Sequence, residues 1–202
     1  MKFILGKKMN MTQVFDAEGR VHGATIVEVG PLVVTQVKTK EKDGYDAVQV
    51  GFGTRKAKNL SKAVKGHVKE LGSFATLKEF RNSGETAYAV GAKVEPTMFK
   101  TGDTVTVSAV SKGKGFQGVV KRHGFGGGPR SHGQKHSERE PGSIGGGLRN
   151  KVPKDMRMAG RMGSDRITVK NLKIVHVDEA TNSIYIEGAV PGKRGTLVEI
   201  KG

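Results

Sequence analysis

The sequence contains no cysteine and no tryptophan, and aromatic residues make up only 5% of its 202 residues. Without cysteine the chain can form neither disulfides nor thiolate zinc sites, and it has no cysteine nucleophile. Acidic residues are also scarce, because 19 Asp and Glu stand against 35 Lys and Arg and leave a net charge of +16. Such a charge repels itself unless a polyanion neutralises it, so nucleic acid is the expected partner.

Long hydrophobic runs are missing as well. No stretch of 18 apolar residues occurs, and no long helix with one basic and one apolar face is evident, which disfavours the alternative partner, an anionic membrane surface. The opening MKFILGKKMN holds only three consecutive apolar residues before Gly6, far fewer than the apolar region of a secretory signal. We therefore expect a cytoplasmic protein.

What the sequence does contain on both sides of its centre is a series of short β-strand patterns. They are rich in β-branched residues and are separated by turn residues such as Gly30-Pro31 and Asp43-Gly44. Several short strands at this spacing predict a small closed or half-closed barrel. The predicted strands are residues 20–29, 32–40, 46–53, 103–110, 167–178, 183–188 and 196–202.

One segment between the strands has a helical pattern. Its apolar residues at 60, 64, 68 and 71 fall on one helical face, and Gly72 follows them as an end signal. Together with the following TLKEFRNSGE it forms an insert of roughly forty residues, with a helix that we expect to pack on the barrel.

The segment from Lys112 to Arg166 combines charge with backbone freedom. It holds 14 of the 30 glycines and thirteen basic residues against four acidic ones, and large apolar residues are few. Such a segment cannot offset an ordering cost of about 1–2 kcal/mol per residue by itself. A flexible linker is the alternative, but Arg, Lys and His recur every three to five residues and prolines stand at 129, 141 and 153.

These residue types suit RNA. Glycines let the backbone approach phosphates closely, Arg grips phosphate through two hydrogen bonds, and Arg or His planes stack on unpaired bases. An out-and-back excursion of this length reaches at most about 80 Å, enough to thread into a crevice of folded RNA. The main alternative partner is duplex DNA, although its grooves are better matched by a helix or ribbon.

Three patterns raise enzyme or metal hypotheses. GKGFQG (113–118) has the spacing of a dinucleotide-binding loop, but too few residues follow for the required helix. Gly142–Gly145 lacks the full spacing of a nucleophile elbow. His123, His132 and His136 form a conceivable metal triad, yet no cysteine or well-spaced carboxylate completes it. We therefore predict a protein that is not an enzyme, has no cofactor and no small-molecule substrate, and uses these histidines on RNA.

Several long motifs resemble a known family. GKGFQGVVKRHGFGGGPRSHG, HSEREPGSIG, RMAGRMGSDRITVKNLKIVHVD, GAVPGKRG and the opening ILGKKMNMTQVFDAEGRVHGATIVEVGP together closely resemble bacterial ribosomal protein L-three. The resemblance covers essentially the whole chain. It implies a structural constituent of the large ribosomal subunit that binds ribosomal RNA near its 3′ end, nucleates assembly, and touches neighbouring proteins of the L-fourteen and L-nineteen families.

The resemblance also implies the architecture. We expect a mainly β single domain (1–202): a six-stranded barrel like the second domain of translation factors, a short α/β insert, and a long irregular loop that penetrates RNA towards the peptidyl transferase centre. Some members carry a methylated glutamine at the position of Gly146, so we expect no such modification. The expected ranges are 1–53, 98–111 and 164–202 for the barrel, 54–97 for the insert and 112–163 for the loop.

The candidate site residues follow from this reading, and none of them is catalytic or a metal ligand. The loop tip is expected at Gly142, Ser143, Ile144, Gly145, Gly146 and Gly147. The expected RNA contacts are Lys112, Lys114, Lys121, Arg122, His123, Arg130, His132, Lys135, His136, Arg139, Arg149, Lys151, Lys154, Arg157, Arg161 and Arg166.

Overall fold

The structure is a computed structural model that describes residues 2–16, 18–81, 88–148 and 150–202. The chain divides into two compact units. The first unit comprises residues 1–110 and 166–202, and the second comprises residues 111–165. No helix in the described part of the chain is long and apolar enough to cross a bilayer.

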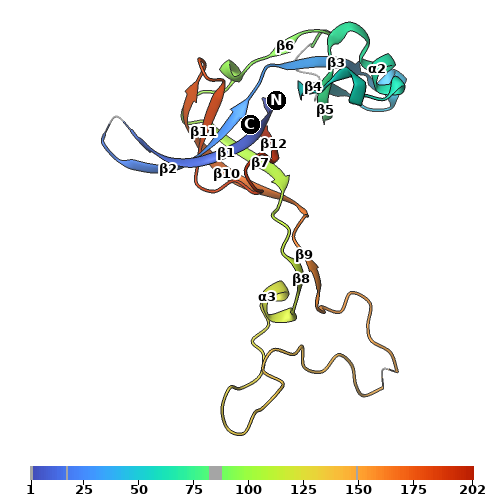
Figure 1. Cartoon of the computed structure of the whole chain (residues 1–202), viewed down its shortest axis with the longest axis vertical. Coiled ribbons are helices and arrows are strands. Elements are labelled where there is room, and N and C mark those ends of the chain that lie inside the picture. The colour runs from blue at the N-terminus through green and yellow to red at the C-terminus, as the bar shows by residue number, and fades with distance from the viewer. Residues whose placement is uncertain (1, 17, 82–87, 149) are drawn as a thin grey trace. The chain divides into compact units, whose positions relative to one another are not determined.

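The first unit contains the predicted barrel (Figure 1). Six strands close it in the order β1-β12-β7-β10-β11-β2, and every neighbouring pair is antiparallel. The expectation of a mainly β protein with a six-stranded barrel is therefore confirmed. The barrel strands are β1 (Phe3–Phe15), β2 (Val21–Val29), β7 (Thr104–Val110), β10 (Arg166–Asp178), β11 (Ser183–Glu187) and β12 (Leu197–Lys201).

The first unit also contains a separate four-stranded sheet in the order β5-β4-β3-β6. Its strands are β3 (Leu32–Lys38), β4 (Ala47–Thr54), β5 (Phe74–Arg81) and β6 (Lys93–Val94). Residues 32–53, which we expected in the barrel, lie here instead. The reason is that β2 already pairs with β1 on one side and β11 on the other, and a closed barrel offers no free edge for a further strand.

A single hydrophobic core joins the barrel to the four-stranded sheet. Val48, Val50 and Phe52 of β4 share one cluster with the barrel side chains. Phe3 of β1 stacks on Phe80 of β5, with ring centroids 4.4 Å apart and an interplanar angle of 15°. The sheet therefore packs on the barrel through an apolar face, and burial of these side chains holds the two together.

Short helices connect the strands of the first unit. The predicted helical insert is present as α2, capped by the Ser61 hydroxyl, which accepts a hydrogen bond from the Val64 amide over 3.3 Å. His67 of α2 hydrogen-bonds Gln49 of β4 over 2.7 Å. The helix therefore lies on the four-stranded sheet, on the face away from the core residues, and the expectation that it packs on the barrel was wrong. The helices are α1 (Lys40–Asp43), η1 (Ala57–Asn59), α2 (Lys62–Val68), η2 (Lys69–Leu71) and η3 (Pro96–Met98).

The second unit has little regular structure. It contains a two-stranded ladder of β8 (Gly115–Gln117) and β9 (Gly160–Met162), and one short helix, α3 (Val119–His123). The described residues between 124 and 159 form no helix or strand, and Figure 1 draws this run as a plain trace between α3 and β9. We call residues 111–165 the arm.

Candidate nucleic-acid interface

Backbone hydrogen bonds close the base of the arm. The Ser111 amide donates to the Asp165 carbonyl over 2.9 Å, and the Lys114 amide donates to the Met162 carbonyl over 2.9 Å. Gly163 makes this closure sterically feasible, because a Cβ there would lie 2.1 Å from the Lys112 carbonyl oxygen. The two limbs therefore start from a paired, fixed base.

The helix α3 holds the returning limb through one carbonyl oxygen. Arg122 donates to the Met158 carbonyl over 2.6 Å, and the His123 ring nitrogen Nε2 lies 3.0 Å from the same oxygen. Gly124 ends α3 in the left-handed conformation with φ 73°. Two residues predicted to contact RNA thus also join the limbs of the arm.

An aromatic contact extends this junction. The Arg157 guanidinium lies 5.0 Å from the centroid of the Phe125 ring, within range of a cation–π interaction. The His123 ring lies 6.0 Å from the same ring in a tilted arrangement. Phe125 therefore organises side chains from both limbs in a unit that otherwise has little apolar material.

The glycine run 126–128 allows a close backbone approach. The Gly128 amide donates to the Glu138 carbonyl over 2.9 Å. A Cβ on Gly127, whose φ is 75°, would lie 2.1 Å from that same carbonyl oxygen. Only glycine fits this position without moving backbone. Beside it lies a hollow of about 320 Å³ lined by Phe125, the three glycines, Ser137, Glu140, Pro141 and Gly142.

The expected loop tip and Leu148, which follows it, present backbone and two aliphatic side chains to solvent. Ser143 donates from its hydroxyl to the Gly145 carbonyl over 2.7 Å. Gly142, Gly146 and Gly147 all have positive φ values. Leu148 is fully exposed, and Ile144 is 39% exposed. The tip region therefore exposes two aliphatic side chains to solvent.

In the part of the arm that the structure describes, few cations have an acidic partner. Within the described part of the arm, a single ion pair occurs, between Arg130 Nε and a Glu138 carboxylate oxygen 3.9 Å apart. Arg122 and His123 are half-buried at α3, and Arg149 lies outside the described residues. The other predicted contacts of the arm are exposed: Lys112, Lys114, Lys121, Arg130, His132, Lys135, His136, Arg139, Lys151, Lys154, Arg157 and Arg161.

Arg166 differs from the other predicted contacts because it belongs to the barrel. It donates to the Glu199 carboxylate over 2.6 Å, and Lys78 of β5 lies 3.0 Å from the other oxygen of that carboxylate. Burial raises the pKa of Glu199, but the hydrogen bonds from Lys78 and Arg166 outweigh it and leave the pKa lowered. Arg166 therefore takes part in an ion-pair bridge between barrel and sheet.

One exposed aromatic residue was missed by the sequence reasoning. Phe116 of β8 is 76% exposed, although its backbone is held in the ladder opposite Arg161. An aromatic side chain in a segment without a core is the signal that would have identified it, because such a ring can stack on a base.

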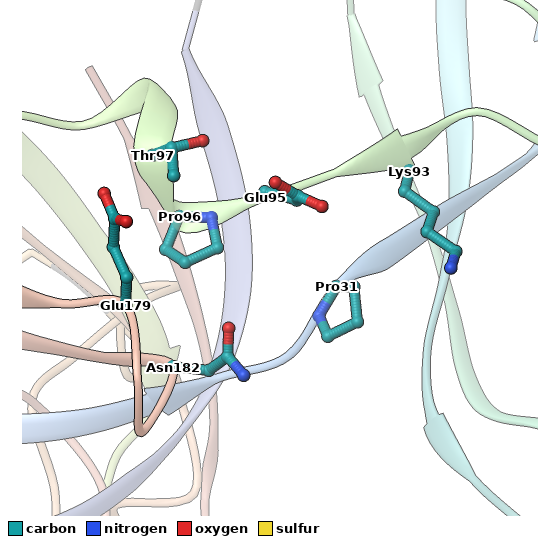
Figure 2. A pocket seen from close by; sticks show the side chains of 7 residues that line it. All are labelled: Pro31, Lys93, Glu95, Pro96, Thr97, Glu179 and Asn182. Carbon is teal, nitrogen blue, oxygen red and sulfur yellow. The ribbon is translucent and has the colours of Figure 1, made fainter.

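One hollow of the first unit has a lining that does not suit a polyanion. Figure 2 shows this hollow of about 370 Å³, with the carboxylates of Glu95 and Glu179 on its wall and Lys93 as its single cation. Its remaining lining residues are Pro31, Pro96, Thr97 and Asn182. Within the described parts of the chain, no three histidine or carboxylate side chains are grouped as metal ligands.

Comparison with known proteins identifies the family. The family model described as "Ribosomal protein L3" matches residues 67–184, more than half of the chain. The chain belongs to the ribosomal protein L3 family. The matched range includes the whole arm and the strands that flank it, so the exposed cations lie in the part by which the L3 family is recognised.

Full-length relatives in the L3 family agree with this assignment, and each is named "Large ribosomal subunit protein uL3". The protein from Herpetosiphon aurantiacus is 47% identical over 199 residues, which cover 98% of this chain and 94% of the relative. The protein from Endomicrobium trichonymphae is 50% identical over 98% of this chain and 88% of the relative. The protein from Dehalococcoides mccartyi is 44% identical over 98% of this chain and 96% of the relative.

Proposed function

We propose that this L3-family chain is a structural constituent of the large ribosomal subunit that binds ribosomal RNA through the arm. Family membership and the shared name of its relatives support the ribosomal role. That role is structural and not enzymatic. The observation that carries the RNA assignment is the array of exposed cations on a segment with little core of its own; among its described members, Arg130 alone has an acidic partner.

The physical argument starts from the charge imbalance of the arm. Twelve basic residues stand against four acidic ones between 111 and 165, and ribosomal RNA supplies the phosphates to neutralise the excess. Arg side chains give bidentate phosphate contacts, while the glycines at 126–128 and 142–147 let RNA approach the backbone closely. Partners among neighbouring ribosomal proteins would then sit on surfaces that the RNA leaves free.

The finer assignment follows the family resemblance. The residues Gly142 to Gly147 form the tip that reaches towards the peptidyl transferase centre, with 121–136 as the entering limb and 151–163 as the leaving limb. The chain binds early and nucleates assembly of the subunit, and its protein neighbours are of the L-fourteen and L-nineteen families. RNA would bury the exposed aliphatic side chains of Ile144 in that tip and of Leu148 next to it.

At the base of the arm, the Phe116 ring could contact RNA by stacking on a base. Its ring is 76% exposed on β8, and the ladder to β9 fixes its backbone. The ring lies in ladder register with Arg161, and Lys114 is two residues away along the chain. This arrangement offers stacking to an unpaired base and cations to the adjoining phosphates. Stacking of this kind contributes about 1–3 kcal/mol per base.

Sedimentation tests the proposal directly. A tagged copy of the full chain, expressed in cells, should co-migrate with the large ribosomal subunit and remain there through moderate salt washes. A nucleoid DNA-binding protein would instead sediment with DNA and be released by DNase. Recovery of the chain in the soluble fraction, apart from any subunit, would refute the ribosomal role.

A further inference from the structure

A second cluster of cations lies on the first unit, outside the arm. Six Lys and Arg side chains occur within fifteen residues, and no acidic residue occurs between Asp46 and Glu70. This is denser than the arm, which spreads twelve over 55 residues. We call the cluster the α2 surface, and its members are Arg55, Lys56, Lys58, Lys62, Lys65 and Lys69.

The α2 surface is built on ordered backbone. The Arg55 amide donates to the Ser73 carbonyl over 2.9 Å, which closes the ends of the excursion between β4 and β5. The Asn59 amide donates to the Lys56 carbonyl over 2.9 Å in η1, and Ser61 caps α2. The six side chains are therefore displayed from a closed, hydrogen-bonded segment.

The helix α2 has two distinct faces. Val68 is 2% exposed on the face towards the sheet, and His67 hydrogen-bonds Gln49 there. Lys62 and Lys65 are three residues apart, so they are neighbours on the helix surface, and both are exposed. The packing of α2 on the sheet thus turns a row of ammonium groups away from the core.

These cations are not neutralised within the structure. In the described residues, no carboxylate lies within ion-pair distance of any of the six, whereas Lys2, Lys38 and Lys78 of the same unit each have an acidic partner. Charges of the same sign on one surface repel each other. A surface that only has to stay hydrated can carry charges of both signs and so avoid this repulsion. A surface of one sign that remains unpaired is expected to meet a polyanion.

We propose that the α2 surface is a second, independent RNA-binding surface that grips the phosphate backbone of ribosomal RNA. The inference rests on the proposed ribosomal role but concerns residues outside the arm. Most of them, Arg55 to Lys65, also precede the range 67–184 by which the L3 family model matches. Since lysine ammonium groups act as point charges, this surface contributes affinity and position and reads no base sequence.

The test uses the full chain and large-subunit ribosomal RNA transcribed in vitro. The surface variant carries Lys56→Gln, Lys58→Gln, Lys62→Gln and Lys65→Gln. The matched control removes the same charge from four exposed lysines that each have an acidic residue within three positions along the chain: Lys40→Gln, Lys42→Gln, Lys93→Gln and Lys100→Gln. An arm variant carries Lys135→Gln, Arg139→Gln, Lys151→Gln and Lys154→Gln.

We expect the surface variant to bind about tenfold more weakly than the control, and its slope of log affinity against log salt to be shallower by about 2 to 3. Hydroxyl-radical footprints should lose protection at nucleotides that the arm variant still protects. Thermal melts of all variants should match the unsubstituted chain, because the substituted side chains are exposed.

Three results would overturn the inference. The first is that the surface variant binds the RNA with the same affinity and salt slope as the control while the arm variant binds more weakly. That result would leave the proposed ribosomal role intact. Another is loss of the same protected nucleotides in the surface and arm variants. The third is failure of the unsubstituted chain to bind this RNA, which would remove the proposed function as well.

Discussion

Arg166 and Glu199 form a hydrogen-bonded ion pair, with the guanidinium nitrogen 2.6 Å from the carboxylate oxygen. The carboxylate is nearly buried, and Lys78 from the four-stranded sheet lies 3.0 Å from its other oxygen. One carboxylate thus bridges β10 of the barrel and β5 of the sheet. The pair marks the point where the chain returns from the arm to the barrel.

Substitution Glu199→Gln should lower the free energy of unfolding by about 2 kcal/mol, because it removes the charged acceptor of two hydrogen bonds. The pKa of Glu199 is lowered in the fold, so its stabilising effect is present above the unfolded value of about 4.3 and disappears as the pH falls through the folded value. Urea unfolding of the wild-type chain and of the variant, at pH 7 and at lower pH, measures the loss of stability and its dependence on pH. Glu28→Gln, an exposed position on β2, should change little, and an equal loss there would argue against the bridge.

His22 should give the barrel a second pH dependence of opposite sign. Its two ring nitrogens lie 3.1 Å from a Glu187 oxygen and 3.2 Å from an Asp16 oxygen. These hydrogen bonds, that to Glu187 first, raise the pKa of His22. The stabilisation is therefore complete below the unfolded pKa of about 6.5 and is lost as the pH rises through the folded value. Urea unfolding of the wild-type chain across this range should show the decline, and His22→Gln should remove it.

Deletion of residues 123–163, closed by a short Gly-Ser linker, should leave a cooperatively folding first unit. All six barrel strands and the four-stranded sheet lie outside the deleted range, and none of the residues that the structure describes within that range belongs to the buried core. Thermal unfolding followed by far-UV circular dichroism should remain a single sharp transition. In the same background, Ile186→Ala should lower stability by about 2–5 kcal/mol. A broad, non-cooperative melt of the deletion would show that the arm supports the barrel.

Gly127→Ala should damage the arm, whereas Gly126→Ala should not. A Cβ at Gly127 meets the Glu138 carbonyl oxygen at 2.1 Å and its φ is 75°, while a Cβ at Gly126 meets nothing within 4 Å. Displacing that backbone costs about 1–3 kcal/mol, so RNA affinity in a filter-binding titration should fall by roughly tenfold, equivalent to about 1.4 kcal/mol. Equal affinities for the two variants would show that this close approach does not matter for binding.

The salt dependence of RNA binding should report the number of phosphate contacts. If about half of ten arm cations neutralise phosphates, log affinity should fall against log salt with a slope of roughly −3 to −5. Filter binding between low and physiological salt measures the slope. A slope near zero would contradict an electrostatic interface. In a separate competition experiment, duplex DNA of equal length should displace the RNA from the chain poorly if folded RNA is the partner.

Several elements could be predicted from the sequence because their signals are local. The strands at 103–110, 167–178 and 183–188 match β7, β10 and β11 closely, since β-branched runs between turn residues suffice to identify them. Helix α2 followed from its apolar spacing and Gly72. The exposure of the arm's cations likewise followed from composition, because a segment with so few large apolar residues has no interior in which to place them.

Pairing partners could not be predicted in the same way. The strands at 32–38 and 47–54 were recognised, but their membership of the four-stranded sheet depends on β1 and β11 having taken both sides of β2. The contacts of Arg122 and His123 to the Met158 carbonyl were also beyond prediction. These contacts join residues that are 36 and 35 positions apart in the chain. The acceptor is a backbone oxygen, and a pattern of side chains does not predict which backbone oxygen is contacted.

The sequence alone determined that this protein is mainly β, strongly basic and built around a glycine-rich arm, because composition and short-range spacing act within a few residues of one another. Only the tertiary structure decided which strands close the barrel, that Arg166 is bound to Glu199 and that the α2 surface turns outward. These features depend on contacts between residues far apart in the chain, where burial, open strand edges and steric fit select among partners of equal local propensity.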